Sequence, residues 1–235
     1  MRLSFGLWYD FRNPAAWRQP WERLYQETLE QVAWADSLGF DSVWLSEHHF
    51  TDDGYLPALL PMLAALAMRT SRLRLGTAVL LAPLHHPLRL AEDAAVVDVL
   101  SGGRLELGLA PGYRATEFAL LGVPRAERGR RTDETIEVVQ AAWRGRPFSD
   151  RGRCFQFDDA VVTPPPLQRP HPPIWVGGAS RRDHPPAATV PVRPAYLLGA
   201  PTRSADRPQH PLPRAVRAGG PPPPGPRHSA GLSSW

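Results

Sequence analysis

Residues 73–109 read LRLGTAVLLAPLHHPLRLAEDAAVVDVLSGGRLELGL, and this stretch sets the architecture of the chain. The apolar run Leu73–Leu81 predicts a strand, and Leu88–Leu100 predicts a helix because its apolar residues recur on one helical face. The small residues at 101–103 end that helix, and Arg104–Leu109 predicts the next strand. The stretch is therefore one strand–helix–strand unit, the unit from which parallel sheets are built.

The same alternation continues on both sides of this unit. We expect the second predicted strand, Ser42–Ser46, to be buried on both faces because it lacks polar alternation. The further predicted strands are Leu3–Trp8, Ser42–Ser46, a short excursion at Cys154–Phe157, and Ile174–Gly177; the further predicted helices are Trp21–Leu38, Leu56–Met68 and Glu127–Trp143.

Regular strand–helix alternation fits either a doubly wound sheet or a (β/α)8 barrel. A dinucleotide-binding doubly wound fold carries G-x-G-x-x-G after its first strand, whereas YDFRNPAAW at residues 9–17 has no glycine. The sequence therefore predicts an α/β TIM barrel, (β/α)8. Five core strands are used by residue 178, and the remaining residues are too few for three more units of roughly 30 residues each. We expect an incomplete barrel of about five βα units, with open edges on its first and fifth strands.

The composition changes after residue 182. Residues 183–235 hold 13 of the 28 prolines, including Pro221–Pro224, and carry a net charge of +4, whereas residues 1–182 are neutral. We expect a partial TIM barrel over residues 1–182 and a disordered Pro/Arg-rich tail over residues 183–235. Such an abrupt change is also what a GC-rich gene gives when it is read out of frame. Translating the other two frames downstream of codon 182 tests that hypothesis.

Composition and charge exclude several classes of protein. No apolar run is long enough to span a membrane, and the start of the chain has no secretory apolar segment. The single cysteine, Cys154, excludes a disulfide framework and a cysteine-rich zinc site. No basic stripe crosses the neutral body, so nucleic acid is not an expected partner. We expect a cytoplasmic location.

Candidate catalytic side chains follow the second predicted strand, because reacting groups of a βα barrel lie at the carboxyl ends of its strands. Glu47 and His48 could form an acid/base pair, in which the carboxylate fixes the imidazole tautomer. The alternative is that they only hydrogen-bond neighbouring loops. Adjacent side chains on an extended segment point to opposite sides, so at most one of His48 and His49 should face the pocket.

Two further constellations have chemical and structural interpretations. The turn Gly177–Ser180 suits a phosphate, because two glycines allow backbone N–H groups to approach an anion; the alternative is a plain tight turn. A metal site would need ligands such as His48, His85 and Glu106 to converge. The alternative for Glu106 is a buried, paired carboxylate inside the barrel, and we expect no metal.

Several motifs in matching order resemble one known family, the bacterial luciferase-like flavin-dependent monooxygenases. The resemblance covers about residues 1–182. It is carried by GFDSVWLSEHHFT at Gly39–Thr51, LGTA at Leu75–Ala78, HPLR at His86–Arg89, ED at 92–93, LSGGR at Leu100–Arg104 and PIWVGGAS at Pro173–Ser180.

The resemblance implies a (β/α)8 fold that binds reduced FMN, or in some branches the deazaflavin F420, at the carboxyl ends of the strands. It further implies a small organic substrate, O2, and a flavin reductase as the electron supplier. A homodimer is one assembly open to such a chain. Ala110-Pro111 departs from luciferase itself, which has a cysteine and an arginine there; Arg114 could substitute for that arginine. Carried over residue by residue, the resemblance makes His48 and Glu47 catalytic and places a non-prolyl cis peptide at Ala78-Val79; the implied cofactor-binding residues are Ala78, Val79, Ala110, Tyr113, Gly177, Gly178, Ala179 and Ser180.

The function we predict is a flavin-dependent oxidoreductase or monooxygenase of the luciferase-like type. We expect the chain to be truncated, and both an active and an inactive form stay open. Two alternatives stay open. One is a non-catalytic barrel remnant that self-associates through its open edge. The other is a metal-dependent barrel hydrolase that uses His48 and His85.

Overall fold

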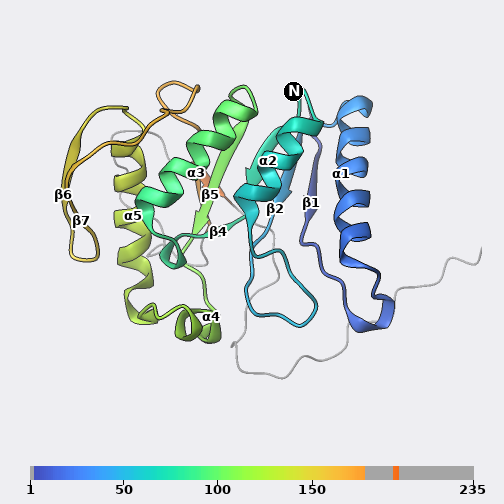
Figure 1. The fold of residues 1–235 in the computed structure, drawn as a ribbon, viewed down its shortest axis with the longest axis horizontal. Coiled ribbons are helices and arrows are strands. Elements are labelled where there is room, and N and C mark those ends of the chain that lie inside the picture. Colours follow the sequence, from blue (N-terminus) through green and yellow to red (C-terminus); the bar gives the residue numbers. More distant parts are fainter. Residues whose placement is uncertain (1–2, 178–192, 196–235) are drawn as a thin grey trace, which may run out of the picture. The chain divides into compact units, whose positions relative to one another are not determined.

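The computed structural model describes residues 3–177 and 193–195. Compactness divides the chain into one unit over Met1–Leu198 and another over Gly199–Trp235, and every described residue belongs to the first unit. Figure 1 shows that unit as one parallel sheet with helices packed along it. The strands, in their order across the sheet, are β1 (Gly6–Tyr9), β2 (Ser42–Leu45), β3 (Arg74–Thr77), β5 (Leu105–Ala110), β8 (Ile174–Gly177) and β9 (Arg193–Ala195), and β4 (Leu80–Leu81) also pairs with β5.

The strand order confirms the predicted barrel topology. Each core strand lies beside the one that precedes it in the chain, all the pairs are parallel, and the order never reverses. A doubly wound sheet would instead reverse its strand order at the first strand of its second half. The described unit is therefore a consecutive portion of a (β/α)8 barrel.

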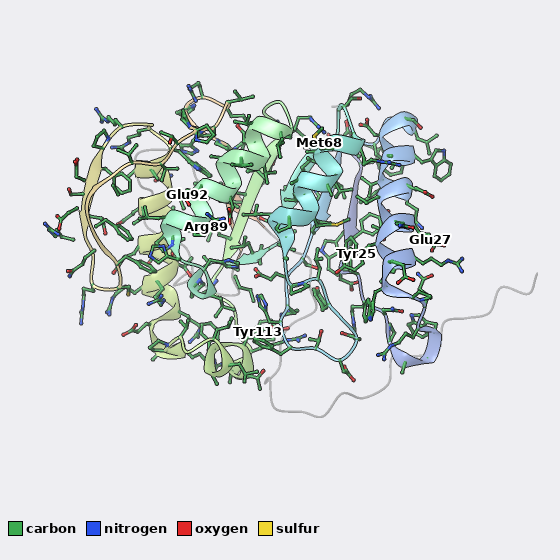
Figure 2. The ribbon with its side chains drawn as sticks, in the orientation of Figure 1. Tyr25, Glu27, Met68, Arg89, Glu92 and Tyr113 are labelled. Carbon is green, nitrogen blue, oxygen red and sulfur yellow. The ribbon has the colours of Figure 1, made fainter. Side chains whose placement is uncertain are left out.

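Helix α1 contacts α2, α2 contacts α3 and α3 contacts α5, and Figure 1 shows these four helices as a row from α1 at the right to α5 at the left, with α4 below it. None of the helices in the described part of the chain is long and apolar enough to cross a bilayer. Arg89 and Glu92 lie on the exposed side of α3, with Arg89 Nη1 3.2 Å from Glu92 Oε2 (Figure 2). The helices are α1 (Trp21–Leu38), α2 (Leu59–Arg69), α3 (Pro87–Leu100), the short α4 (Ala115–Leu120) and α5 (Arg128–Ala142), with single 3-10 turns at Ala15–Trp17, Ala82–Leu84 and Arg125–Glu127.

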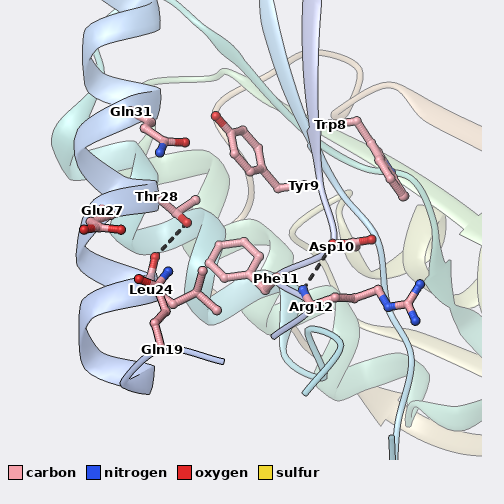
Figure 3. A pocket seen from close by; sticks show the side chains of 10 residues that line it. All are labelled: Trp8, Tyr9, Asp10, Phe11, Arg12, Gln19, Leu24, Glu27, Thr28 and Gln31. Carbon is pink, nitrogen blue, oxygen red and sulfur yellow. Dashed lines mark hydrogen bonds between the residues drawn. The ribbon is translucent and has the colours of Figure 1, made fainter. Parts of the chain in front are cut away.

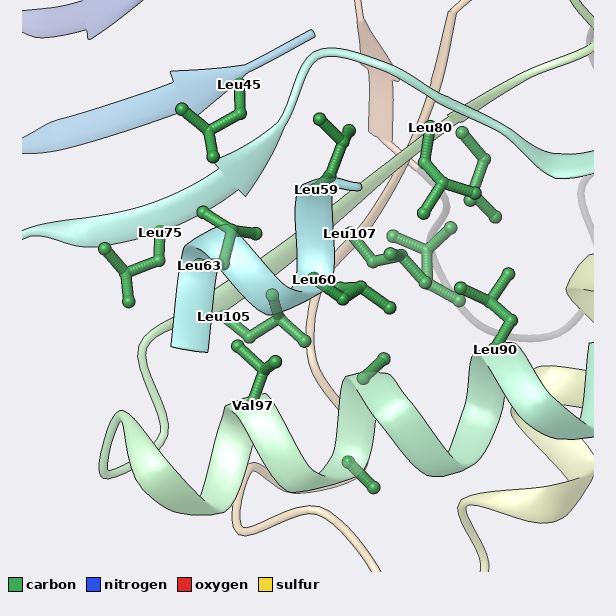
Figure 4. Close-up of a cluster of buried hydrophobic side chains, with 14 of the residues drawn as sticks. Leu45, Leu59, Leu60, Leu63, Leu75, Leu80, Leu90, Val97, Leu105 and Leu107 are labelled. Atoms are coloured by element: carbon green, nitrogen blue, oxygen red, sulfur yellow. The ribbon is translucent and has the colours of Figure 1, made fainter. Parts of the chain in front are cut away.

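The core lies between the sheet and this row of helices (Figure 4). Leu45 and Leu75 from the strands meet Leu63 of α2, and all three side chains are fully buried. Each such side chain contributes roughly 1.5–3 kcal/mol by leaving water. The opposite face of the sheet is less covered, because Ser42 and Trp44 of β2 are only half-buried. The expectation that Ser42–Ser46 is buried on both faces is therefore wrong.

Several predicted elements differ in detail. The predicted strand Leu73–Leu81 is split into β3 and β4 at the Ala78-Val79 peptide, which is cis, as the resemblance implies. Helix α2 begins later than the predicted Leu56, because Pro57 disfavours helical backbone at the residue before it. The predicted excursion Cys154–Phe157 is an antiparallel hairpin of β6 (Phe148–Arg151) and β7 (Gln156–Ala160).

Strand β9 lies inside the segment predicted to be a disordered tail. It pairs in parallel with β8, so the expectation of an open edge on the fifth core strand is wrong. Composition misled here because Pro194 weighs against a strand, although proline is tolerated on the edge of a sheet. The rest of the predicted tail, residues 183–192 and 196–235, lies outside the described residues.

The amino ends of the strands are held together by two charged side chains. Asp36 accepts hydrogen bonds from the backbone N–H groups of Ser71 at 2.8 Å and Leu73 at 2.9 Å, which fix the turn that leads into β3. The Arg104 guanidinium donates to the carbonyl oxygens of Ala67 (3.0 Å) and Leu73 (2.9 Å), among others. Together these contacts join the end of α2 to the starts of β3 and β5.

Candidate active site

The carboxyl ends of the core strands bring most of the predicted site residues to one edge of the sheet. Because the strands are parallel, the segments after β2, β4 and β5 leave the sheet at this edge, where β8 also ends at Gly177. Figure 2 shows Tyr113, which follows β5, at the lower edge of the view, where Figure 1 shows α4. At this edge His48 lies against Tyr113, and Val79, Ala110 and Gly177 lie close to one another.

Three of the predicted cofactor-binding residues pack together at this edge. A Cβ atom added to Gly177 would lie 3.1 Å from Val79 Cγ1 and 3.8 Å from Ala110 Cβ. The end of β8 therefore lies close to Val79, just before β4, and to Ala110 at the end of β5, with little room for a side chain at Gly177. Gly178, Ala179 and Ser180, which were predicted to meet the phosphate, lie outside the described residues.

His48 is held by a carboxylate that sequence reasoning missed. Its Nδ1 lies 2.8 Å from Oε1 of Glu117 on α4. Its Nε2 faces the Tyr113 hydroxyl at 3.3 Å, and its ring packs edge-on against Tyr113 and against Tyr55, with ring centroids 5.5 and 4.7 Å apart. The imidazole is thus fixed in position with one nitrogen directed toward the loop after β5.

Glu117 is an anion in a fully buried position. Burial raises the pKa of this carboxyl. The hydrogen bonds from His48 and from the backbone N–H of His49 lower the pKa by more than burial raises it, so that it lies below its ordinary value. Its Oε2 has no hydrogen-bond partner among the described residues. A carboxylate can only accept, so the proton of neutral His48 is on Nδ1 and Nε2 is left to accept or return a proton.

Glu47 does not pair with His48, so that prediction is wrong. Its Oε1 instead lies 2.7 Å from His49 Nε2 and 2.8 Å from His85 Nε2, while its Oε2 accepts the Leu81 backbone N–H at 2.6 Å. Neighbouring side chains of an extended segment point to opposite sides, and this alternation separates Glu47 from His48 just as it separates His48 from His49.

Those contacts fix the charge state of Glu47 and its partner His49. Burial raises the pKa of the Glu47 carboxyl, but the two imidazoles and the Leu81 N–H lower it more, to about 2. Burial likewise lowers the pKa of the His49 imidazole, and the Glu47 carboxylate raises it more, so that it lies above its ordinary value. Glu47 is therefore an anion with both oxygens engaged.

The metal constellation His48, His85 and Glu106 is not formed, so the ligand set proposed for a hydrolase is wrong. His48 binds Glu117 and His85 binds Glu47. Glu106 accepts from Arg74 Nε at 2.8 Å and from Trp175 Nε1 at 2.7 Å, on the side of the sheet opposite the helices. Glu106 is thus the paired carboxylate that the structural interpretation expected.

The sequence held a weak signal for the helix that carries Glu117. Ala115–Leu120 is rich in good helix formers, and Gly122 follows with a positive φ of 68°, as at a helix end. Gly112 and Gly122 flank this segment, and glycine is more typical of loops than of helices, so the local pattern is ambiguous. Without the helix, nothing indicated that Glu117 reaches His48.

A separate cavity of about 230 Å³ lies beside β1 and the first half of α1 (Figure 3). Phe11 and Leu24 line it, and the Phe11 ring packs 4.8 Å from the Tyr25 ring, measured between centroids. None of the predicted site residues lines this cavity. The cavity is therefore separate from the cluster around His48.

The chain matches the family model for luciferase-like monooxygenases over residues 3–200. The match extends beyond residue 182, where the sequence alone placed its end, and it includes β9. Three curated relatives have similar levels of identity. A flavin-dependent trigonelline monooxygenase oxygenase component of Acinetobacter baylyi is 35% identical over 71% of this chain and 47% of its own length. An FMNH(2)-dependent dimethylsulfone monooxygenase of Pseudomonas putida is 34% identical over 70% of this chain and 46% of its own. An F420-dependent glucose-6-phosphate dehydrogenase of Microbacterium testaceum is 36% identical over 69% and 48%.

A solved structure agrees with the fold. Monooxygenase RslO1 from Streptomyces bottropensis superposes with a TM-score of 0.71 at 34% identity, covering 75% of this chain and 54% of that one. The chain spans about half the length of the curated relatives it matches.

Proposed function

The chain belongs to the luciferase-like monooxygenase family, and from this premise we propose that it is a flavin-dependent oxidoreductase that oxygenates a small organic substrate with O2. Relatives of similar identity use FMNH2 or F420, and we propose reduced FMN as the cofactor of this chain, with F420 as the second candidate.

The observation that carries the proposal is the close approach of Val79, Ala110 and Gly177 at the edge that also holds His48. A ring system laid across these small residues would meet main chain and short side chains, which is the surface a flat cofactor requires. Val79 leaves so little space that even a methyl group on Gly177 would crowd it. The residues present thus fit a flavin at this edge.

Within that arrangement we assign His48 as the residue that transfers a proton. Its Nε2 accepts a proton from the reacting group or returns one, since Nδ1–H is committed to Glu117. Glu117 is a positioning residue that keeps the tautomer and stabilises the imidazolium while the proton is held. Bound reduced flavin supplies the two electrons with which dioxygen is activated.

The remaining cofactor contacts follow from the resemblance. We assign the backbone of Ala78 to the flavin ring and the turn Gly178, Ala179 and Ser180 to its phosphate. Glu47 lies one residue from His48 and anchors the loop after β4 through Leu81, so its proposed role is to shape the site.

We further propose a separate flavin reductase as electron supplier, in keeping with a relative that is an oxygenase component. A cytoplasmic location suits a chain with one cysteine. A homodimer is the proposed assembly. Its test is sedimentation, in which a monomer at every concentration would contradict it.

The experiment is an anaerobic titration of the full chain with reduced FMN and with reduced F420, followed by tryptophan fluorescence. We expect saturable quenching by one of the two in the wild type. Gly177→Val fills the space against Val79 and should weaken binding at least tenfold. Gly129→Val is the matched control, because a Cβ at Gly129 has no atom within 4 Å, and it should bind within twofold of the wild type.

Two results would overturn the proposal. One is the absence of quenching by either cofactor in folded wild-type protein. The other is equal weakening by the two glycine variants, with their far-ultraviolet circular dichroism unchanged.

A further inference from the structure

Three side chains of metal-ligand type converge beside the proposed flavin site, and none of them is assigned a contact with the cofactor. Glu47, His49 and His85 each offer one donor atom, and these atoms all lie within 4.8 Å of one another. No other such group occurs in the parts of the chain that the structure describes. We propose that this Glu–His–His cluster binds a divalent transition metal ion, with zinc as its representative.

The donor set is that of an open zinc site. Two imidazole nitrogens and one carboxylate oxygen are a common protein ligand set for zinc, with a fourth position left to water. Both imidazoles present the same nitrogen, Nε2, to the same oxygen of Glu47, at 2.7 and 2.8 Å. The three donors therefore already face one point from the ends of two different loops.

The distances allow an ion to enter by small side-chain movements. Zinc bonds of about 2.0–2.1 Å in tetrahedral geometry place donor atoms roughly 3.3 Å apart. The two nitrogen–oxygen separations must then open by about half an ångström. The ion takes the place of the proton on each Nε2, and a neutral imidazole keeps its proton on Nδ1.

The carboxylate is oriented by a contact that a metal ion would not disturb. Glu47 Oε2 accepts the Leu81 backbone N–H at 2.6 Å, which leaves Oε1 directed at the two imidazoles. Partners of this kind hold the ligands of metal sites in place. The Glu47 side chain is 1% exposed, whereas that of His85 is 32% exposed, so an ion has a path to the cluster on the His85 side.

The matched control is the histidine next in sequence. His86 is not part of the cluster, and its ring packs against Phe155 and Phe157, with ring centroids 6.1 and 5.7 Å apart. His85→Gln and His86→Gln therefore remove the same chemical group one residue apart, and only the first removes a proposed ligand.

The experiment is a competition titration of the chelator-treated full chain with zinc against a chromophoric chelator. We expect one equivalent bound by the wild type, at least a tenfold loss of affinity in His85→Gln and in Glu47→Gln, and affinity within twofold of the wild type in His86→Gln. Thermal unfolding of each zinc-free variant verifies that it is folded.

Cobalt(II) provides a second measurement on the same proteins. Cobalt(II) bound by the cluster should give the visible absorption bands of a low-symmetry cobalt site. We expect these bands in the wild type and in His86→Gln and their loss in His85→Gln. The proposal is overturned if wild-type protein binds no zinc, if the two histidine variants bind alike, or if cobalt gives a thiolate band, which would place the ion at Cys154.

Discussion

The two ends of the parallel strands use their charged side chains differently. At the amino end, Asp36 and Arg104 are saturated by hydrogen bonds that tie helix ends to strand starts. At the carboxyl end Glu47 also has both oxygens engaged, but buried Glu117 has one oxygen without a partner among the described residues, and His48 presents a ring nitrogen to a tyrosine that is 53% exposed. Groups whose hydrogen-bonding atoms all have partners stabilise a fold, whereas groups with an unpartnered hydrogen-bonding atom are free to take part in chemistry. The barrel thus separates stability from function along its strands.

Arg104→Ala tests whether the amino end of the strands contributes to stability and not to cofactor binding. Arg104→Ala leaves several carbonyl oxygens without a donor, among them those of Ala67 and Leu73. We expect a loss of about 3–5 kcal/mol in the free energy of unfolding, measured with urea. Cofactor affinity of the folded fraction should stay within twofold. A variant of wild-type stability with weakened cofactor binding would reverse the roles of the two ends.

Asp36→Asn tests the same end with a smaller change and adds a pH dependence. Burial raises the pKa of the Asp36 carboxyl, and hydrogen bonds from Ser71, Leu73 and Arg72 lower it more, so that it lies below its ordinary value of 3.8. A depressed pKa stabilises the fold above 3.8, and this stabilisation is lost as the pH falls toward the folded-state pKa. We expect the substitution to cost about 2 kcal/mol at pH 6 and progressively less below pH 4. Urea unfolding at a series of pH values measures the difference, and a difference that grows on acidification would contradict it.

Glu117→Gln tests the carboxyl end of the strands. It removes a buried charge that has one unpartnered oxygen, so the free energy of unfolding should change by less than about 1 kcal/mol. The proton of His48 loses its charged acceptor, and the share of the Nδ1–H tautomer should fall. Nitrogen NMR of the histidine rings measures this, with His86 as the internal reference. Unchanged His48 ring shifts would show that Glu117 does not set the tautomer.

Local pattern predicted the elements that bury a regular apolar face. Helix α1 has the predicted bounds Trp21–Leu38, followed by Gly39 with a positive φ of 92°, and β8 is the predicted Ile174–Gly177. The strand order followed from alternation together with the missing glycine motif. Strand β9 was lost because composition was weighed over a long segment, whereas three residues suffice for an edge strand.

The site was predicted less completely than the fold. Motif resemblance singled out His48, Val79, Ala110, Tyr113 and Gly177 as candidates, and each lies in or shortly after a strand that the pattern had placed. The partner of His48 lies 69 residues away on a helix of six residues, and pairing at that distance depends on packing that no local pattern encodes. Glu47 was found, but its partners were assigned by sequence adjacency, which alternation along an extended segment forbids.

The central claim is that the carboxyl edge binds the reduced cofactor while the amino edge does not. Amide hydrogen exchange of the full wild-type chain, with and without saturating reduced FMN under anaerobic conditions, tests it most directly. We expect slower exchange at residues 47–56, 78–85 and 110–118 and no change at residues 69–74 and 100–105. Protection confined to the second set of segments would contradict it.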